Sequence, residues 1–304
     1  MKIMRGWRKF WKPESDLSRV IRAMWTRYKA HNVGTESAAL AFYLIFAIFP
    51  FLIFISALLN FFQLSIVGAI RMASDLLPAE LVEIAEMFLQ YGAGKPTLRL
   101  LITSLFFSFY YPMRATNSLM LSVRMAYRLG APNGVVIQTI KNLIYTLLLI
   151  FSIILTVLLM TVSNRILAYA EENLLLPSFV ADWWTTLRFP IIAAIGYLDL
   201  TALYALAQDH WQKWRNLWPG TLAALGGWMT VAWLYTLYVN NIARYSFIYG
   251  SIGTMIVLLI WLNFTSMAMI LGAELNGALM SIRKERFNQD LYQNLNLDIN
   301  QDNI

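Results

Sequence analysis

Six apolar runs dominate the sequence, and they restrict the chain to folds that can satisfy a backbone inside lipid. Each run is long enough, or nearly so, to cross the roughly 30 Å of hydrocarbon in a bilayer. The runs are Ser37–Phe62, Leu98–Met113, Thr139–Val162, Leu187–Gln208, Leu217–Asn240 and Gly250–Leu275. Charged residues make up only 13% of the 304 residues, about half of what a soluble domain carries. The sequence therefore predicts an all-α polytopic membrane protein with six transmembrane helices.

The distribution of basic residues predicts the orientation of these spans. Of the 24 Lys and Arg residues, 18 fall in segments on one side of the predicted bilayer and six on the other. Residues 1–36 alone hold nine of them. Because basic loops stay in the cytoplasm, we expect both termini to be cytoplasmic. The net charge of +7 is then a topology signal, and we expect no nucleic-acid partner.

Three stretches outside the runs have the periodicity of amphipathic interfacial helices. In residues 17–28 an apolar stripe leaves Arg19, Arg22 and Arg27 largely off its face. This helix suits either anionic lipid headgroups or packing on the rest of the protein. Ile66–Tyr91 predicts an outer interfacial helix, and Met113–Leu129 a cytoplasmic one.

The chain thus divides into three predicted parts. Residues 1–36 form a basic amphipathic cytoplasmic segment, and residues 37–280 form the six-span domain. Residues 281–304 form a polar cytoplasmic tail. Within this tail Asn288–Ile304 is rich in Asn, Gln and Asp, a composition that predicts disorder.

Several kinds of chemistry are not expected. The chain has no Cys and two His residues that belong to no metal-ligand spacing, so we expect neither a metal nor a cofactor. The sequence "GAGKP" at Gly92–Pro96 departs from the phosphate-binding loop, because Leu89 and Pro96 replace its required Gly and Ser or Thr. We therefore expect a protein that is not an enzyme and has no ATPase of its own.

Polar residues inside the runs are the candidate functional residues. A rise of about 1.5 Å per residue places Asp199 and Asn263 roughly 18 and 20 Å into their spans, near the midplane, and Glu274 at the cytoplasmic interface. A charge at the midplane costs about 2.5–3.5 kcal/mol on insertion scales, so Asp199 should face the bundle interior. We hypothesise that Asp199 and Asn263 share one polar site and that Arg114, Arg124 or Arg128 holds Glu274. Hydrogen bonding between helices is the alternative for both midplane residues.

Other candidates lie near the ends of the spans. Arg114 and Asn117 are candidate substrate contacts at the cytoplasmic face. Tyr249, Gly250 and Gly253 could form a flexible external gate, although an aromatic interface belt is the plainer account. Gly220, Ala224 and Gly227 are spaced at i, i+4 and i+7 and predict close approach of another helix to the fifth span.

Three segments resemble the YihY/BrkB family of bacterial inner-membrane proteins, historically also labelled ribonuclease BN. They are "SAALAFYLIFAIFPFLIF" at Ser37–Phe54, "WRNLWPGTLAALGGW" at Trp214–Trp228 and "YGSIGTMIVLLIWLNFTSMAMILGAELN" at Tyr249–Asn276. The resemblance runs from about residue 20 to 280 and implies a six-span, multi-pass protein of the bacterial plasma membrane. Members have been called virulence factors, and lipid transport in the envelope has been proposed for some relatives.

Two functions follow from these observations. The first is transport or flipping of a lipid or other amphipathic envelope molecule; the alternative is a non-transporting scaffold that organises envelope proteins. A cavity open to lipid with Asp199 or Arg114 on its wall would favour the first, and a solid bundle would favour the second. An enzyme within the membrane ranks below both.

Overall fold

The computed structural model describes residues 16–61, 98–130, 132, 134–173, 178–209, 216–242 and 246–301. This part of the chain is helical apart from the short segments between helices. The helices are α2 (Asp16–Ala30), α3 (Val33–Phe61), α6 (Leu98–Ala126), α7 (Val135–Asn173), α8 (Ser178–Leu206), α9 (Trp218–Ile242) and α10 (Ser246–Gln301). The six helices from α3 to α10 coincide with the six apolar runs, as expected where a backbone must satisfy its own hydrogen bonds.

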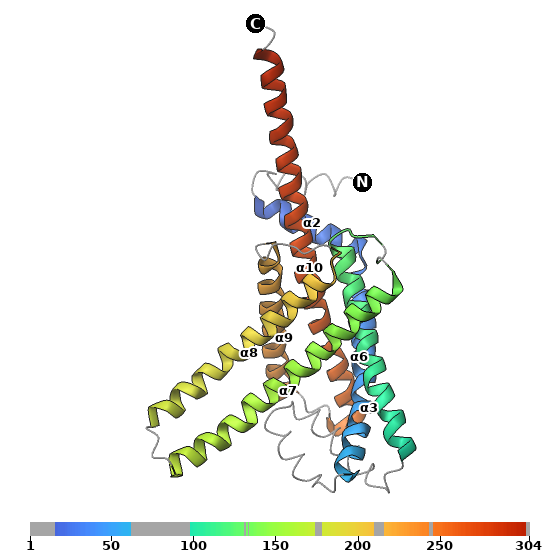
Figure 1. Cartoon of the computed structure of the whole chain (residues 1–304), viewed down its shortest axis with the longest axis vertical. Coiled ribbons are helices and arrows are strands. Elements are labelled where there is room, and N and C mark those ends of the chain that lie inside the picture. The colour runs from blue at the N-terminus through green and yellow to red at the C-terminus, as the bar shows by residue number, and fades with distance from the viewer. Residues whose placement is uncertain are drawn as a thin grey trace.

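Helix α10 runs through the centre of the bundle and contacts α2, α3, α6 and α9 (Figure 1). Helix α3 packs along α6. Helices α7 and α8 form a pair that contacts the other helices through α6 and α9. This pair diverges from the bundle toward the end opposite α2 (Figure 1). The helices therefore lie close together near α2, and α7 and α8 lie apart from the others toward the opposite end (Figure 1).

The larger hydrophobic core joins all the helices of the bundle. Fully buried members such as Val33, Met120, Tyr145, Tyr204 and Ile270 come from α3, α6, α7, α8 and α10. Many large apolar side chains point outward instead, including Phe106, Ile144, Phe151 and Trp233. An outer surface this apolar is typical of a protein solvated by lipid.

Among the described residues, four helices contain segments long and apolar enough to cross a membrane. These segments are Val33–Phe54, Val135–Thr156, Phe189–Leu206 and Met255–Glu285, within α3, α7, α8 and α10. The all-helical fold with several candidate spans is confirmed for the described residues, whereas the count of six stays a prediction.

One sequence-based expectation for the segments between the apolar runs differs from the structure. Helix α6 continues through Pro112 to Ala126, so the stretch Met113–Leu129 mostly extends a predicted span and is not a separate interfacial helix. Proline removes one backbone hydrogen bond, but the turns before Pro112 already supply a helical nucleus from which the helix can continue. The interfacial stretch Ile66–Tyr91 lies outside the described residues.

The tail differs as well. Helix α10 extends to Gln301, so most of the tail predicted to be disordered is helical in the structure. Extending an existing helix needs no new nucleus, which offsets the polar composition of this segment. The predicted boundaries at residues 36/37 and 280/281 fall inside α3 and α10, and no break in either helix marks them.

Candidate functional site

A pocket of about 630 Å³ lies between α6 and α7, at the end of the bundle where α2 sits. Its polar wall carries Arg114 and Asn117 from α6 together with Gln138 and Asn142 from α7. Helical spacing brings these side chains together, because i, i+3 and i, i+4 positions share a face. The pocket is also lined by Tyr110, Met113, Leu121, Pro132, Gly134, Val135 and Thr139. The structure thus unites two of the predicted site residues, Arg114 and Asn117.

The amides in this wall form a chain of hydrogen bonds. Gln138 Nε2 donates to Asn142 Oδ1 at 3.1 Å, and Asn142 Nδ2 donates to Asn117 Oδ1 at 2.8 Å. Gln138 and Asn142 are buried, with 8% and 4% exposure. Since each amide donates to the next, the chain ends at Asn117, whose own amide nitrogen has no partner among the described residues. The wall therefore presents a donor to the pocket.

A polar row continues from the pocket along α7. It consists of Gln138, Asn142, Thr146 and Ser152, all buried in a helix that is otherwise largely apolar. Thr146 Oγ1 lies 3.0 Å from Thr116 Oγ1 of α6. Ser152 follows Gln138 by 14 residues, or roughly 21 Å along the helix. It leads from the pocket toward the part of α7 that lies deepest in the predicted span.

Asp199 lies at the far end of this row. Ser152 Oγ donates to Asp199 Oδ1 at 2.8 Å, so the carboxylate joins α8 to α7. Asn263 lies on α10 and is half-buried, and among the described residues no hydrogen bond joins it to Asp199. The predicted Asp199–Asn263 site stays a prediction, whereas the link from Asp199 to the α7 row was not expected.

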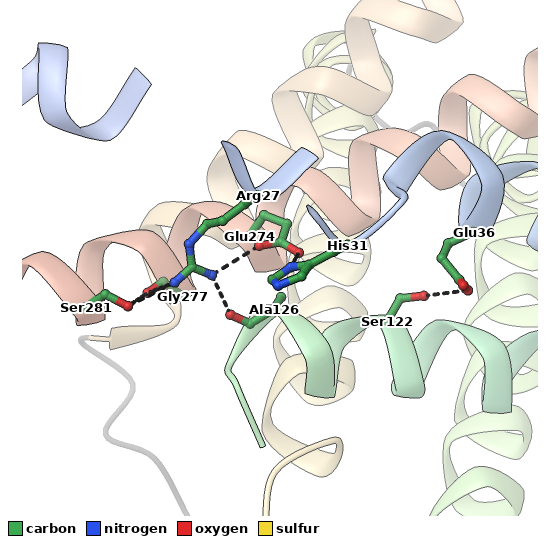
Figure 2. A network of polar contacts seen from close by, with 8 residues as sticks. All are labelled: Arg27, His31, Glu36, Ser122, Ala126, Glu274, Gly277 and Ser281. Atoms are coloured by element: carbon green, nitrogen blue, oxygen red, sulfur yellow. Dashed lines mark hydrogen bonds and ion pairs between the residues drawn. The ribbon is translucent and has the colours of Figure 1, made fainter. Parts of the chain in front are cut away.

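Glu274 anchors a second polar network, shown in Figure 2. Its carboxylate is fully buried and is contacted by Arg27 Nη1 at 3.1 Å and by His31 Nδ1. Arg27 also donates to the carbonyl oxygens of Ala126 and Gly277, at 2.7 and 3.1 Å, and to Ser281 Oγ at 2.9 Å. This network fastens α2 to α6 and α10.

The expected partners of Glu274 were therefore wrong. Arg124 instead pairs with Asp209, with 2.7 Å between Nη1 and Oδ1, and donates to the Ala207 and Gly130 carbonyls. Arg114 Nε donates to Tyr110 Oη at 3.2 Å, and Arg128 is exposed in the turn after α6. Depth along a helix was predicted from spacing, but spacing does not give the direction of a side chain across the bundle.

The structure also decides how α2 packs. The two interpretations of its basic face were membrane binding and packing on protein. Arg27 is buried in the Glu274 network, so it cannot serve lipid headgroups in this arrangement. Arg19, Arg22 and Lys29 are exposed. Lipid contact through these three residues stays a prediction.

Helices α9 and α10 meet at small residues, as predicted. A Cβ added at Gly220 would clash with the carbonyl oxygen of Gly272, and one at Gly227 would lie 3.2 Å from Ala268 Cβ. Asn276 closes this contact, because its Oδ1 accepts from Gly220 N at 2.7 Å and its Nδ2 donates to Leu217 O at 2.8 Å. The buried amide therefore satisfies backbone groups at the start of α9.

The gate hypothesis stays a prediction. Tyr249 and Gly250 belong to the first turns of α10, which begins at Ser246, and Gly253 is buried in the same helix. Across the part of the chain that the structure describes, no group of three or more His, Cys, Asp or Glu residues could hold a metal ion.

Sequence reasoning missed most of the polar residues of α7 and the partners of the charged groups. Gln138, Asn142, Thr146 and Ser152 lie on one side of a 39-residue apolar helix, and this periodicity is visible in the sequence. By contrast, nothing in the spacing of Arg27 and Glu274, which are 247 residues apart, indicates that they pair.

Comparison with known proteins agrees with the resemblance seen in the sequence. The family described as "Virulence factor BrkB" matches residues 24–293. A ribonuclease-like protein, YfkH of Bacillus subtilis (strain 168), is 26% identical over 264 residues, which cover 87% of this chain and 96% of YfkH.

More distant relatives are named only as membrane proteins. A UPF0761 membrane protein of Stenotrophomonas maltophilia (strain R551-3) is 24% identical over 86% of this chain and 61% of its own length. One from Xanthomonas campestris pv. campestris (strain B100) is 22% identical over 92% of this chain and 65% of its own length. The chain thus spans less than two thirds of the length of these UPF0761 relatives. No solved structure matches. Because the family match covers most of the chain, the protein belongs to the BrkB family of membrane proteins.

Proposed function

We propose that this protein carries a lipid or other amphipathic envelope molecule across the bacterial plasma membrane, with six spans and both termini in the cytoplasm. The observation that carries the proposal is the buried polar row of α7, which joins the pocket between α6 and α7 to Asp199. The presence of Arg114 on the pocket wall also favours transport over a solid scaffold.

The physical argument concerns the cost of moving a polar headgroup through hydrocarbon. A lone polar group there loses its hydrogen bonds to water, at a cost of several kcal/mol. The amides and hydroxyls of the row can replace those bonds stepwise when α7 moves away from α6. Meanwhile the acyl chains can stay in the bilayer, against the exposed apolar side chains of α6 and α7 such as Phe106 and Ile144. The lipid would move down its own concentration gradient, or its movement would be coupled to an ion gradient.

The test is lipid translocation by the purified protein in vesicles. A trace of fluorescent phospholipid is added, and a membrane-impermeant reductant destroys the probe in the outer leaflet. We expect the reductant to destroy the probe of both leaflets when wild-type protein is present, because transport moves probe from the inner leaflet to the outer one. Asp199→Asn keeps the shape of the side chain and removes its charge, so translocation should slow by about tenfold or more while the variant still inserts.

A matched pair of substitutions separates the row from general packing. Thr146→Val removes a buried hydroxyl from the row, whereas Thr230→Val removes an exposed one from α9, and both keep the side-chain shape. We expect slower translocation only for Thr146→Val. Vesicles with wild-type protein that behave like empty vesicles would contradict the proposal. So would an Asp199→Asn variant that loses thermal stability but keeps its rate.

A scaffold function is the second candidate, and one observation favours it. The C-terminal part of α10 projects well beyond the bundle (Figure 1). A projecting helix offers a surface for another protein without any transport. If no translocation is found for a range of lipids, this candidate takes precedence.

A further inference from the structure

We propose that the pocket between α6 and α7 binds the phosphate-bearing headgroup of an anionic phospholipid, with Arg114 and Asn117 as its contacts. The inference names the substrate class for the proposed transport and so rests on that function. It concerns the end of the polar row at the pocket, where, in the proposed topology, a lipid of the cytoplasmic leaflet would enter.

The charge of the pocket selects an anion. Arg114 is the only charged residue among the described residues that line it, and no Asp or Glu lies on its wall. Arg114 uses Nε to donate to Tyr110 Oη at 3.2 Å, with its charge 5.6 Å from the centre of the Tyr110 ring. This contact orients the guanidinium, and its two Nη groups have no partner among the described residues. A planar guanidinium with free donors binds phosphate through two parallel hydrogen bonds.

A second donor lies on the same face of α6. Asn117 follows Arg114 by three residues, and its Oδ1 already accepts from Asn142 Nδ2. That hydrogen bond fixes which end of the Asn117 amide is free, because the oxygen is occupied and the nitrogen is not. Gln138 holds Asn142 in turn. The amide chain therefore presents an oriented N–H group beside the guanidinium.

The rest of the pocket favours a lipid over a soluble phosphate ester. Met113, Leu121 and Val135 line it, and the exposed side chains of Val136 and Ile140 continue the apolar surface on α7. A soluble phosphate ester gains nothing from such a surface, whereas the glycerol backbone and first carbons of a lipid do. A pocket of about 630 Å³ also exceeds what a phosphate alone would fill.

Binding is measured on the full chain in detergent, so the result does not depend on transport. Titration with short-chain phosphatidylglycerol is compared with phosphatidylcholine, which has the same phosphate but no net charge, and with soluble glycerol phosphate. We expect Arg114→Gln to weaken phosphatidylglycerol binding about tenfold or more, as is typical for a lost hydrogen bond to a charged group. Arg128→Gln removes an exposed charge just beyond the same helix and should change the affinity less than about twofold.

A second variant guards against a change in folding. Asn117→Asp keeps the side-chain shape but places a carboxylate beside the headgroup, so it should abolish the preference for phosphatidylglycerol over phosphatidylcholine. Equal affinity of wild type for the two lipids, or no effect of Arg114→Gln, would overturn the proposal. Glycerol phosphate binding as tightly as phosphatidylglycerol would identify a soluble ligand instead. Selective binding without any translocation in vesicles would leave this site standing and refute the transport function.

Discussion

Glu274 shows how a single buried carboxylate can decide where a helix sits. Its side chain is 1% exposed and that of Arg27 is 7% exposed. Because water cannot reach either charge, each one is stabilised by the other. Arg27 also satisfies the carbonyl oxygen of Ala126 at the end of α6 and that of Gly277 within α10. The pair thus fixes α2 across the bundle, whatever its net contribution to the free energy of unfolding.

The substitution Glu274→Gln should destabilise the protein by about 3 kcal/mol, because it leaves the Arg27 charge buried without a counter-charge. The measurement is the midpoint of unfolding in an SDS titration of the purified protein. Glu285→Gln changes an exposed carboxylate on the same helix and should shift the free energy by less than about 0.5 kcal/mol. Similar shifts for the two variants would show that the buried pair does not hold α2.

At the scale of elements, the contact between α9 and α10 depends on the absence of side chains. Gly220 and Gly272 each bring a carbonyl oxygen against the other helix where a Cβ would stand. Close approach of this kind increases van der Waals contact, which drives helix association where lipid removes the hydrophobic effect. Gly226 lies on the same helix, and an added Cβ there would meet nothing within 4 Å.

These two glycines of α9 make a paired test. Gly220→Ala should destabilise the protein by about 1–3 kcal/mol, since overpacking forces the helices apart. Gly226→Ala should be neutral or stabilising by up to about 1 kcal/mol, because Ala favours the helix and clashes with nothing. SDS titration again gives the free energies. A gain of stability of the same size in both variants would mean that helix propensity, and not close packing, sets the effect of Gly220→Ala.

The sequence predicts well where the helices lie along the chain and poorly which side chains of different helices face each other. The six runs correspond to α3 and α6–α10, and the small residues of α9 predict its contact, because apolar length and glycine spacing are local properties. Glu274 was expected at the cytoplasmic interface, which stays a prediction, and its partner Arg27 lies 247 residues away on a helix whose Arg19 and Arg22 are exposed. The spacing of these Arg residues does not indicate which of them turns inward.

For the whole molecule, an even number of spans is consistent with α2 and the far end of α10 lying at the same end of the bundle (Figure 1). From the distribution of basic residues we predict that this end lies in the cytoplasm. Green fluorescent protein fused after Ile304 should fluoresce, and alkaline phosphatase fused at the same point should be inactive. A phosphatase inserted between residues 173 and 178 should be active. Phosphatase activity from the C-terminal fusion alone would contradict this topology.

The pairing of Arg27 with Glu274 also constrains the order in which the protein assembles during synthesis. Arg27 leaves the ribosome 247 residues before its partner is made. At about 5–20 residues per second, roughly 12–50 s pass in which Arg27 lacks its counter-charge. During that interval its cations are free to remain at the anionic membrane surface. The pair can form only after this part of α10 has been made, so a nascent chain that stalls before Glu274 lacks the ion pair that fastens α2 to α10.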